Sequence, residues 1–552
     1  MRHLMICASL LALSACAAET QDRSEVVAIK GNIITMNDAQ PRAAAMVLGE
    51  DGGITAIGDV ALLDQYPDAR VIDLAGRTIV PGFIDSHAHV REFGMDRIKA
   101  DLVGAETVEE MVALLQARFP NPKAGVWLIG QGWDEGEFAT RGYPDRAALD
   151  AAFPDNPVAL ESLHGFGGFY NGKALEIAGL NAETPDPEVG DILRREDGSP
   201  TGVMLTLAQD LVDQHIPQPD QAMREEAIIA ALETMAAAGV TSIHEAGMEP
   251  LDVAAFKSLR AKDALPARVY GLLDGNNDAL IADWFAAGIS DDPQDWLDIR
   301  SIKIFYDGSL GSRTALMAKP YSDKPDAARP TERISPEKLQ TLANEAQAKG
   351  FQMAVHAIGD EGNNRTLDIY ESALDGDAFS RWRIEHAQVV LPDYYDRVAD
   401  LKILSSVQSS HAVGDSGWAE DRVGAERIQH AYAWQRILNA GGELMLNSDM
   451  PGEPWTPMET LYFAVTRAKL DGTPPGGWYA EQALSVEEAL KAMTLTNAYG
   501  AFQEDALGSL EAGKWADFVV LDADPTAVAP ATLKDIQVLQ TWINGEPVYQ
   551  AE

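Results

Sequence analysis

The chain has 552 residues, of which 46% are hydrophobic and 23% charged, a composition typical of soluble globular proteins and unlike that of fibrous or disordered ones. Its 43 basic and 85 acidic residues give a formal charge of −42. Such a charge repels phosphate backbones and argues against nucleic acid as a partner. We interpret the excess of acid as a solvated surface.

The first sixteen residues, MRHLMICASLLALSAC, predict an export signal, because a basic start at Arg2 is followed by an apolar stretch and then by small residues. The last four, LSAC, resemble the bacterial lipobox, which makes Cys16 the lipidated first residue of the mature protein. An ordinary cleaved signal with an incidental cysteine is the alternative. The other cysteine, Cys7, lies inside the signal, so no disulfide framework is possible. We therefore expect an exported protein of the periplasm or cell envelope, attached to a membrane only through lipid.

Both ends of the chain have the alternating residue pattern of β-strands. After a polar linker at 17–25, VVAIKGNIITM and AAAMVLGEDGGITAIGD alternate apolar and polar residues around glycine and Asn-Asp turns, a pattern typical of an antiparallel sheet. A similar pattern occurs near the C-terminus, in LGSLEAGKWADFVVLDADP and VLQTWINGEPVY. The sequence predicts one small β-sandwich domain, built from residues 26–80 and 501–552.

Between these ends, residues 81–500 repeat a helix followed by a short apolar strand, as in AMREEAIIAALETMAAAG before VTSIHEA. This repetition predicts an α/β fold with a parallel sheet, and eight such units close into a (β/α)8 barrel of the TIM type. The span exceeds the usual ~250 residues, so we expect insertions at 134–225, 315–335 and 411–432. The predicted strand cores are 79–87, 126–130, 239–244, 300–306, 351–356, 382–386, 402–408 and 443–448.

Two histidines end the first predicted barrel strand, in IVPGFIDSHAHV. Residues i and i+2 of a strand share a face, so His87 and His89 point the same way. Two neighbouring imidazoles can bind a divalent metal, although paired histidines also occur as hydrogen-bonded structure.

Lys303 lies in SIKIFYDG, where a charged ammonium is costly to bury beside Ile302 and Ile304. One interpretation is a lysine that reaches the strand end or pairs with a carboxylate. The other is that burial lowers its pKa and leaves a neutral amine. Such an amine can add carbon dioxide and become a carbamate, an anionic ligand able to bridge two metals.

Three more polar residues follow apolar strands: His356 in FQMAVHAIGD, His386 in WRIEHAQVV and Asp449 in ELMLNSDMP. Taken singly, each is explained as a core histidine or a turn residue. Active sites of these barrels are built at the carboxyl ends of the strands. The order HxH, Lys, His, His, Asp at those ends predicts that six side chains converge on one or two divalent ions, and zinc suits this mixture of nitrogen and oxygen ligands.

The stretch PGFIDSHAH resembles the first-strand signature of the amidohydrolase superfamily, and the resemblance runs from about residue 26 to the C-terminus. QGWDE, KIFYDGSLGSRTA, HAIGD, IEHAQ and SVQSSHAVGD resemble its YtcJ-like branch, which contains N-substituted formamide deformylase. The resemblance implies one metal held by His87, His89 and Asp449 and another held by His356 and His386. Carbamylated Lys303 would bridge them, and a single ion is the alternative.

The chemistry that this implies is hydrolysis of a C–N bond in a small amide, N-formyl or cyclic amide substrate by metal-activated hydroxide. Asp449 would serve as the general base that takes a proton from water and passes it to the leaving amine. Two alternatives stay open: an ester hydrolase with the same centre, and a metal-bearing binding lipoprotein without catalysis. The substrate's identity and the oligomeric state are not specified by these motifs.

Three further residues are candidates for substrate contacts. His411, in SVQSSHAVGD, is expected to polarise the substrate carbonyl or bind its oxyanion, with a histidine in a mobile loop as the alternative. Trp133 and His164 are expected to line the pocket. A core tryptophan and a structural turn histidine are the alternatives for these two.

Overall fold

The computed structural model describes residues 26–134, 142–162, 167–187, 190–326, 329–377, 379–451 and 453–551. The export signal, Cys16, the linker and His164 lie outside these residues. Within them the strands form three sheets, of seven, six and eight strands. None of the helices in the described part of the chain combines the length and apolarity that crossing a bilayer requires.

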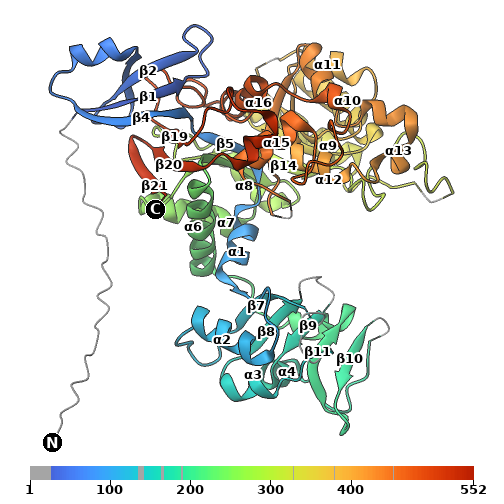
Figure 1. The fold of residues 1–552 in the computed structure, drawn as a ribbon. Helices are drawn as coiled ribbons and strands as arrows, with labels where there is room; N and C mark the ends of the chain where they lie inside the picture. The colour runs from blue at the N-terminus through green and yellow to red at the C-terminus, as the bar shows by residue number, and fades with distance from the viewer. Residues whose placement is uncertain are drawn as a thin grey trace, which may run out of the picture.

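The seven-stranded sheet joins the two ends of the chain, as the sequence predicts (Figure 1). Its order is β21-β20-β19-β4-β1-β2-β3. β1 and β4 run parallel, where an antiparallel sheet was expected. The reason is that the chain crosses over after β3, through the 3-10 turn η1 (Val60–Gln65), and returns beside β1 in the same direction. The strands are β1 (Val27–Ile34), β2 (Arg42–Leu48), β3 (Ile54–Gly58), β4 (Arg70–Pro81), β19 (Phe518–Leu521), β20 (Val538–Ile543) and β21 (Glu546–Gln550).

The eight-stranded sheet is the predicted parallel barrel. A parallel bridge between Ala88 and Met450 closes it from its last strand to its first, and every pair in between is parallel. Its strands are β5 (Phe83–Ala88), β12 (Val240–Met248), β13 (Arg268–Asp274), β14 (Leu297–Phe305), β15 (Gln352–Ala357), β16 (Arg383–His386), β17 (Leu404–Gln408) and β18 (Glu443–Asn447).

The barrel helices have clear sequence signals at their ends. Ser335 caps the first turn of α9 (Pro336–Lys349), Pro336 opens it, and Gly350 ends it in the left-handed conformation. The other helices of this region are α7 (Pro250–Ala261), α8 (Asp278–Ala287), α10 (Asp360–Leu374), α11 (Tyr394–Leu401), α12 (Ser409–Asp415), α13 (Ala419–Arg427), α14 (Trp434–Asn439), α15 (Pro457–Thr466), α16 (Val486–Ala492) and α17 (Leu495–Gly500).

One predicted barrel strand is wrong. Residues 126–130 overlap β7 (Leu128–Trp133), which belongs to the six-stranded sheet, and β13 takes the vacant place in the barrel. A short apolar run has the same local pattern in either sheet, so periodicity cannot assign it. The insertion therefore begins directly after α1 (Val90–Ile98), earlier than the predicted residue 134.

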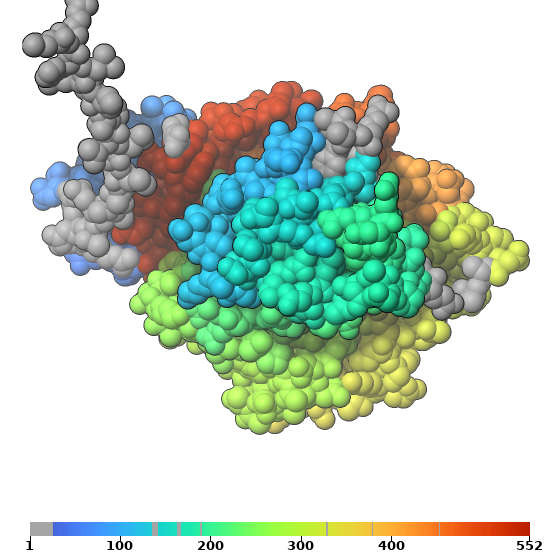
Figure 2. Space-filling model, turned by 90° about the horizontal axis from the view of Figure 1, so that it is seen from below, coloured from blue at the N-terminus to red at the C-terminus, as the bar shows by residue number. Residues whose placement is uncertain are grey.

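The six-stranded sheet, in the order β10-β11-β9-β8-β7-β6, has its own apolar core with Leu115, Leu149 and Phe169. The helices α1 and α6 (Gln221–Ala237) connect this sheet to the barrel (Figure 1). Figure 2 shows the inserted region, coloured blue to green, covering one face of the molecule. A Cβ on Gly94 would lie 1.9 Å from the Ala227 oxygen, so α1 and α6 pack backbone to backbone. The elements of the inserted region are β6 (Ala100–Asp101), α2 (Val108–Arg118), β7, α3 (Ala147–Ala152), β8 (Val158–Ser162), β9 (Gly167–Tyr170), α4 (Gly172–Ala178), β10 (Asp191–Arg194), β11 (Pro200–Leu205) and α5 (Asp210–Asp213).

Candidate functional site

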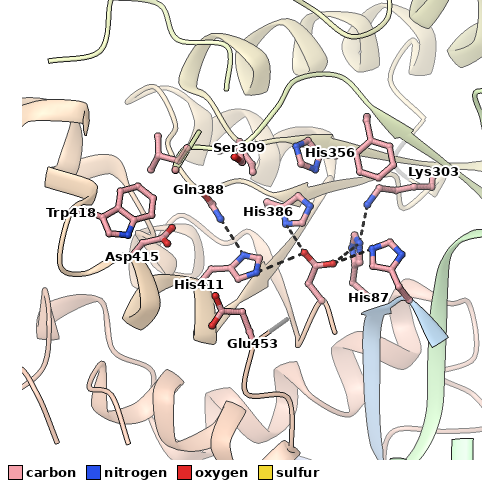
Figure 3. A pocket seen from close by; sticks show the side chains of 16 residues that line it. His87, Lys303, Ser309, His356, His386, Gln388, His411, Asp415, Trp418 and Glu453 are labelled. Carbon is pink, nitrogen blue, oxygen red and sulfur yellow. Dashed lines mark hydrogen bonds and ion pairs between the residues drawn. The ribbon is translucent and has the colours of Figure 1, made fainter. Parts of the chain in front are cut away.

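A cavity of about 350 Å³ opens at the carboxyl ends of the barrel strands (Figure 3). The six side chains singled out from the sequence as metal ligands all face it, together with His411. Lys303 and His386, which come from different strands, therefore lie at the same hollow. Its described lining is His87, His89, Lys303, Phe305, Ser309, Leu310, Gly311, His356, Ile358, His386, Gln388, His411, Asp415, Trp418, Asp449 and Glu453.

The closure of the barrel brings three of these side chains together. The Asp449 N–H donates to the His87 carbonyl at 2.9 Å. His87 Nε2 and His89 Nε2 then lie 3.4 and 3.3 Å from Asp449 Oδ1. One ligand atom from each of the three residues lies within 4.8 Å of the others, a spacing at which they could hold one ion.

The other oxygen of Asp449 faces a second group. His386 Nδ1 and His411 Nε2 lie 3.7 and 3.8 Å from Asp449 Oδ2, and these three residues also offer ligand atoms within 4.8 Å of one another. Burial opposes ionisation of Asp449, but the neighbouring His87, His89 and His386 hold its pKa well below the usual range. Asp449 is thus an ionised carboxylate between two sets of imidazoles.

Lys303 is buried, with 1% of its surface exposed, and its Nζ lies 2.8 Å from His87 Nε2. Burial lowers the pKa of Lys303 to about 8. A lysine with this pKa is neutral for an appreciable fraction of the time near neutral pH, which is the form that reacts with carbon dioxide. The residue thus has the chemistry that a carbamate requires.

His356 completes the set with an unused nitrogen. Its Nε2 lies 3.2 Å from the Gly308 carbonyl, while its buried Nδ1 has no hydrogen-bond partner among the described residues. A buried nitrogen without a partner is costly. Burial also lowers the pKa of His356 to about 3, so the ring is neutral, as a metal ligand must be. The donor set around the cavity therefore fits a divalent cation.

Two of these residues have strained backbones. His386 has φ 78° and Asp449 has φ 55°, in the left-handed region that side chains other than glycine rarely adopt. Such conformations cost roughly 1–3 kcal/mol each and persist where the surrounding structure over-determines them. Both residues lie at or just after the end of a strand, and both side chains line the cavity.

Glu385 supports the site and was missed by the sequence analysis. One of its oxygens lies 2.5 Å from His87 Nδ1, and the other accepts from Arg383 Nε at 2.7 Å. Burial raises the pKa of Glu385, but Arg383 and His87 together hold it well below the usual range. The carboxylate thus keeps the His87 proton on Nδ1 and leaves the lone pair of Nε2 facing Lys303 Nζ and the cavity. The signal was available, because RIEH places two charged residues inside a short buried strand.

Other lining residues were not singled out from the sequence, although Gln388 and Asp415 end the quoted stretches IEHAQ and SVQSSHAVGD. Gln388 follows β16, Asp415 ends α12, and Trp418 and Glu453 lie in the segments that follow α12 and β18. They reach the cavity because the chain after each barrel strand folds over its mouth.

Trp133 does not line the cavity, so that prediction is wrong. Its side chain is fully buried in the core of the six-stranded sheet, where Nε1 donates to the Leu160 carbonyl at 3.0 Å. The ring also packs edge-on against Phe169, with centroids 6.1 Å apart. The error follows from assigning β7 to the barrel.

Comparisons with known proteins agree with this geometry. Residues 70–549 match the model of a family described as the amidohydrolase family. The putative amidohydrolase YtcJ of Bacillus subtilis is 31% identical over 94% of this chain and 98% of its own length. N-substituted formamide deformylase of Arthrobacter pascens is 28% identical over 95% of this chain and 98% of its own.

The solved structure of an uncharacterised metal-dependent hydrolase from Pyrococcus horikoshii OT3 is also similar. It matches with a TM-score of 0.74 and 28% identity, over 92% of this chain and 99% of that one. The family match spans most of the sequence and coincides with a cavity rich in metal-binding side chains. This chain belongs to the amidohydrolase family of metal-dependent hydrolases.

Proposed function

We propose that the protein hydrolyses the C–N bond of a small amide, with N-formyl and cyclic amides as the foremost candidates. The observation that carries the proposal is Asp449, an ionised carboxylate at the floor of the cavity with one oxygen toward His87 and His89 and the other toward His386 and His411. The name of the Arthrobacter relative, a deformylase of N-substituted formamides, supports an amide-type substrate.

Zinc or a similar divalent ion would be held by His87, His89 and Asp449, with a second position at His356 and His386 and carbamylated Lys303 between them. When bound, such an ion lowers the pKa of water to roughly 7 in favourable zinc sites and polarises a carbonyl oxygen. Carbamylation joins the neutral Lys303 Nζ to the carbon of carbon dioxide and releases one proton to solvent.

Asp449 acts as the general base in this proposal. Its carboxylate takes a proton from the attacking water and delivers it to the nitrogen of the leaving amine as the C–N bond breaks. Its low pKa keeps it ionised at neutral pH, which is the form that can accept a proton. His411, whose Nε2 lies 3.8 Å from Asp449 Oδ2, stabilises the negative charge that develops on the carbonyl oxygen.

A substrate panel tests the reaction class. N-formyl amines, N-acyl amino acids, cyclic amides and aryl esters are compared with the zinc-loaded protein, and a chelated sample of the same preparation serves as the control. We expect metal-dependent release of amine from at least one amide class. Turnover of esters alone would replace the amide assignment with an esterase, and no turnover of any compound would favour a binding protein.

Reconstitution tests the carbamate. The protein stripped of metal is reloaded with zinc in buffer depleted of carbon dioxide and in buffer with added bicarbonate. Because the bridging ligand then requires the added carbon, we expect activity and bound zinc to recover faster with bicarbonate. Equal recovery in both buffers would show that Lys303 acts as a plain amine.

For localisation we propose export and lipid attachment at Cys16, on the strength of the LSAC segment. The full-length protein is expressed in bacteria supplied with a radiolabelled fatty acid, beside a Cys16→Ser variant. The label should enter the wild-type protein and not the variant. An unlabelled protein cut elsewhere in its first residues would contradict the lipoprotein assignment.

A further inference from the structure

Three histidines of the cavity differ in what faces their Nδ1 atoms. At His87 the neighbour is a carboxylate oxygen of Glu385, and at His386 it is Gln408 Oε1, at 2.9 Å. An oxygen acceptor draws the ring proton to Nδ1 and leaves Nε2 with a free lone pair. Both rings are therefore set up to offer Nε2 as a ligand or acceptor.

His411 has the opposite arrangement. Its Nδ1 lies 3.1 Å from the amide nitrogen of Gln388, which is a donor. A neutral imidazole that accepts at Nδ1 carries its proton on Nε2. Nε2 is also the atom that faces the floor of the cavity, 3.8 Å from Asp449 Oδ2, so the ring presents an N–H there (Figure 3).

Gln388 is well held for this role. Its side chain is buried, with 5% of its surface exposed, and its backbone carbonyl accepts from the Tyr432 N–H at 2.7 Å. A β-bridge between Val389 and Ala431 ties the same two segments together. These contacts hold the backbone segment that carries the Gln388 side chain.

Tyr432 lies on the other side of the amide. Its hydroxyl lies 3.4 Å from Gln388 Oε1 and contacts Asp415 Oδ2 as well. The single hydroxyl proton goes to the closer Asp415 Oδ2, so the hydroxyl is a neighbour of Gln388 Oε1 and not its donor. The Gln388 side chain lies with Oε1 toward Tyr432 and its NH2 group toward His411. Asp415 and His411 are both on α12, so Tyr432 contacts the same helix that carries the histidine.

We infer that Gln388 is a positioning residue: it fixes His411 in the tautomer protonated on Nε2, so that a hydrogen-bond donor points into the cavity. His411 then binds the carbonyl oxygen of the substrate and does not join His386 and Asp449 in holding a cation. This inference rests on the proposed function, since it assigns the atom that meets the substrate carbonyl.

The first test measures the tautomer directly and does not depend on activity. The full-length, zinc-loaded protein is labelled with ¹⁵N on its histidine side chains, of which the chain has ten, and the His411 signals are assigned by their loss in His411→Asn. We expect Nε2 to be protonated and Nδ1 to be bare. A proton on Nδ1 of His411 would overturn the inference, whatever the substrate proves to be.

The second test removes the donor with Gln388→Met, which keeps the side-chain length. The His411 signals should become those of mixed tautomers, and bound zinc should stay unchanged. Losing one oxyanion donor outright costs about 10²–10³-fold in kcat, so a partial loss should lower kcat at least about tenfold, with KM changed far less. Gln435→Met, on α14 outside the described cavity lining, should change none of these quantities.

Tyr432→Phe provides an independent check, because it leaves Gln388 in place and removes the hydroxyl that lies between Gln388 Oε1 and Asp415. We expect the same mixture of tautomers with a smaller loss of kcat. If both variants keep the wild-type tautomer and kcat, Gln388 has no positioning role. If no amide is hydrolysed while the tautomer is as stated, the proposed function fails and the role of Gln388 in setting the ring proton stands.

Discussion

The barrel and the six-stranded sheet end their strands in contrasting ways. In the barrel, β5, β14, β15, β16 and β18 lead into side chains that face one cavity, among them His356, whose Nδ1 has no hydrogen-bond partner in the described part of the chain. In the six-stranded sheet, the polar atom of Trp133 is satisfied internally by the Leu160 carbonyl. The same local pattern, an apolar strand followed by a distinctive side chain, becomes a site only where the strands close on one another. Substitutions at the barrel edge should therefore alter chemistry, whereas those in the six-stranded sheet should alter stability.

The largest effect is expected from removing two ligands together. His87→Ala combined with His89→Ala should reduce bound metal and turnover to background, since both rings face Asp449 Oδ1. His215→Ala, an exposed histidine, is the matched control and should retain wild-type metal content by elemental analysis. Unchanged metal in the double variant would refute the ligand assignment.

Asp449→Asn should leave the fold intact and lower kcat about 10³-fold, because an amide of the same shape cannot accept the proton from water. Steady-state kinetics and a thermal melt measure the two properties. Asp274→Asn serves as the control, since Asp274 also ends a barrel strand but is absent from the described lining of the cavity. Comparable rates in Asp449→Asn and wild type would remove the general-base role.

Glu385→Gln tests the contact between the Glu385 carboxylate and His87 Nδ1. A neutral amide holds the Nδ1 proton more weakly than a carboxylate does, and changes of this kind typically cost about 10–100-fold in metal affinity or activity. Competition with a coloured chelator measures zinc affinity. We expect weaker zinc binding with kcat restored at high zinc. A zinc affinity equal to that of wild type would mean that Glu385 does not support His87 as a ligand.

The smallest effect lies in the six-stranded sheet. Trp133→Phe loses the bond to Leu160 and part of the ring volume, so the free energy of unfolding should fall by about 1–2 kcal/mol with kcat and KM unchanged. Trp418→Phe, on the cavity wall, should show the converse, a changed KM with little loss of stability. If Trp133→Phe alters KM, the separation of the two regions is incomplete.

Much of the site was predictable because a strand has a period of two and the carboxyl ends of barrel strands meet at one edge. His87, His89 and Lys303 could therefore be placed near one another from their positions on apolar strands. Glu385 was missed although RIEH places two charged residues in one short buried strand, because that pattern does not show which atoms they meet. Gln388 was missed because the turn after β16 does not show which way a side chain faces. Trp133 was wrongly predicted to line the cavity, because no local feature of β7 indicates which sheet the strand joins.

The sequence by itself determined the fold class, the union of the two chain ends in one sheet, and the short list of residues able to hold a metal. These depend on periodicity, capping and motif, which are properties of a few consecutive residues. The tertiary structure alone decided which apolar run became β13 of the barrel and which became β7 of the inserted sheet. It also decided which atom faces each imidazole, and therefore where each ring carries its proton. Those outcomes depend on contacts between segments tens to hundreds of residues apart, such as His87 with Glu385 and Asp449.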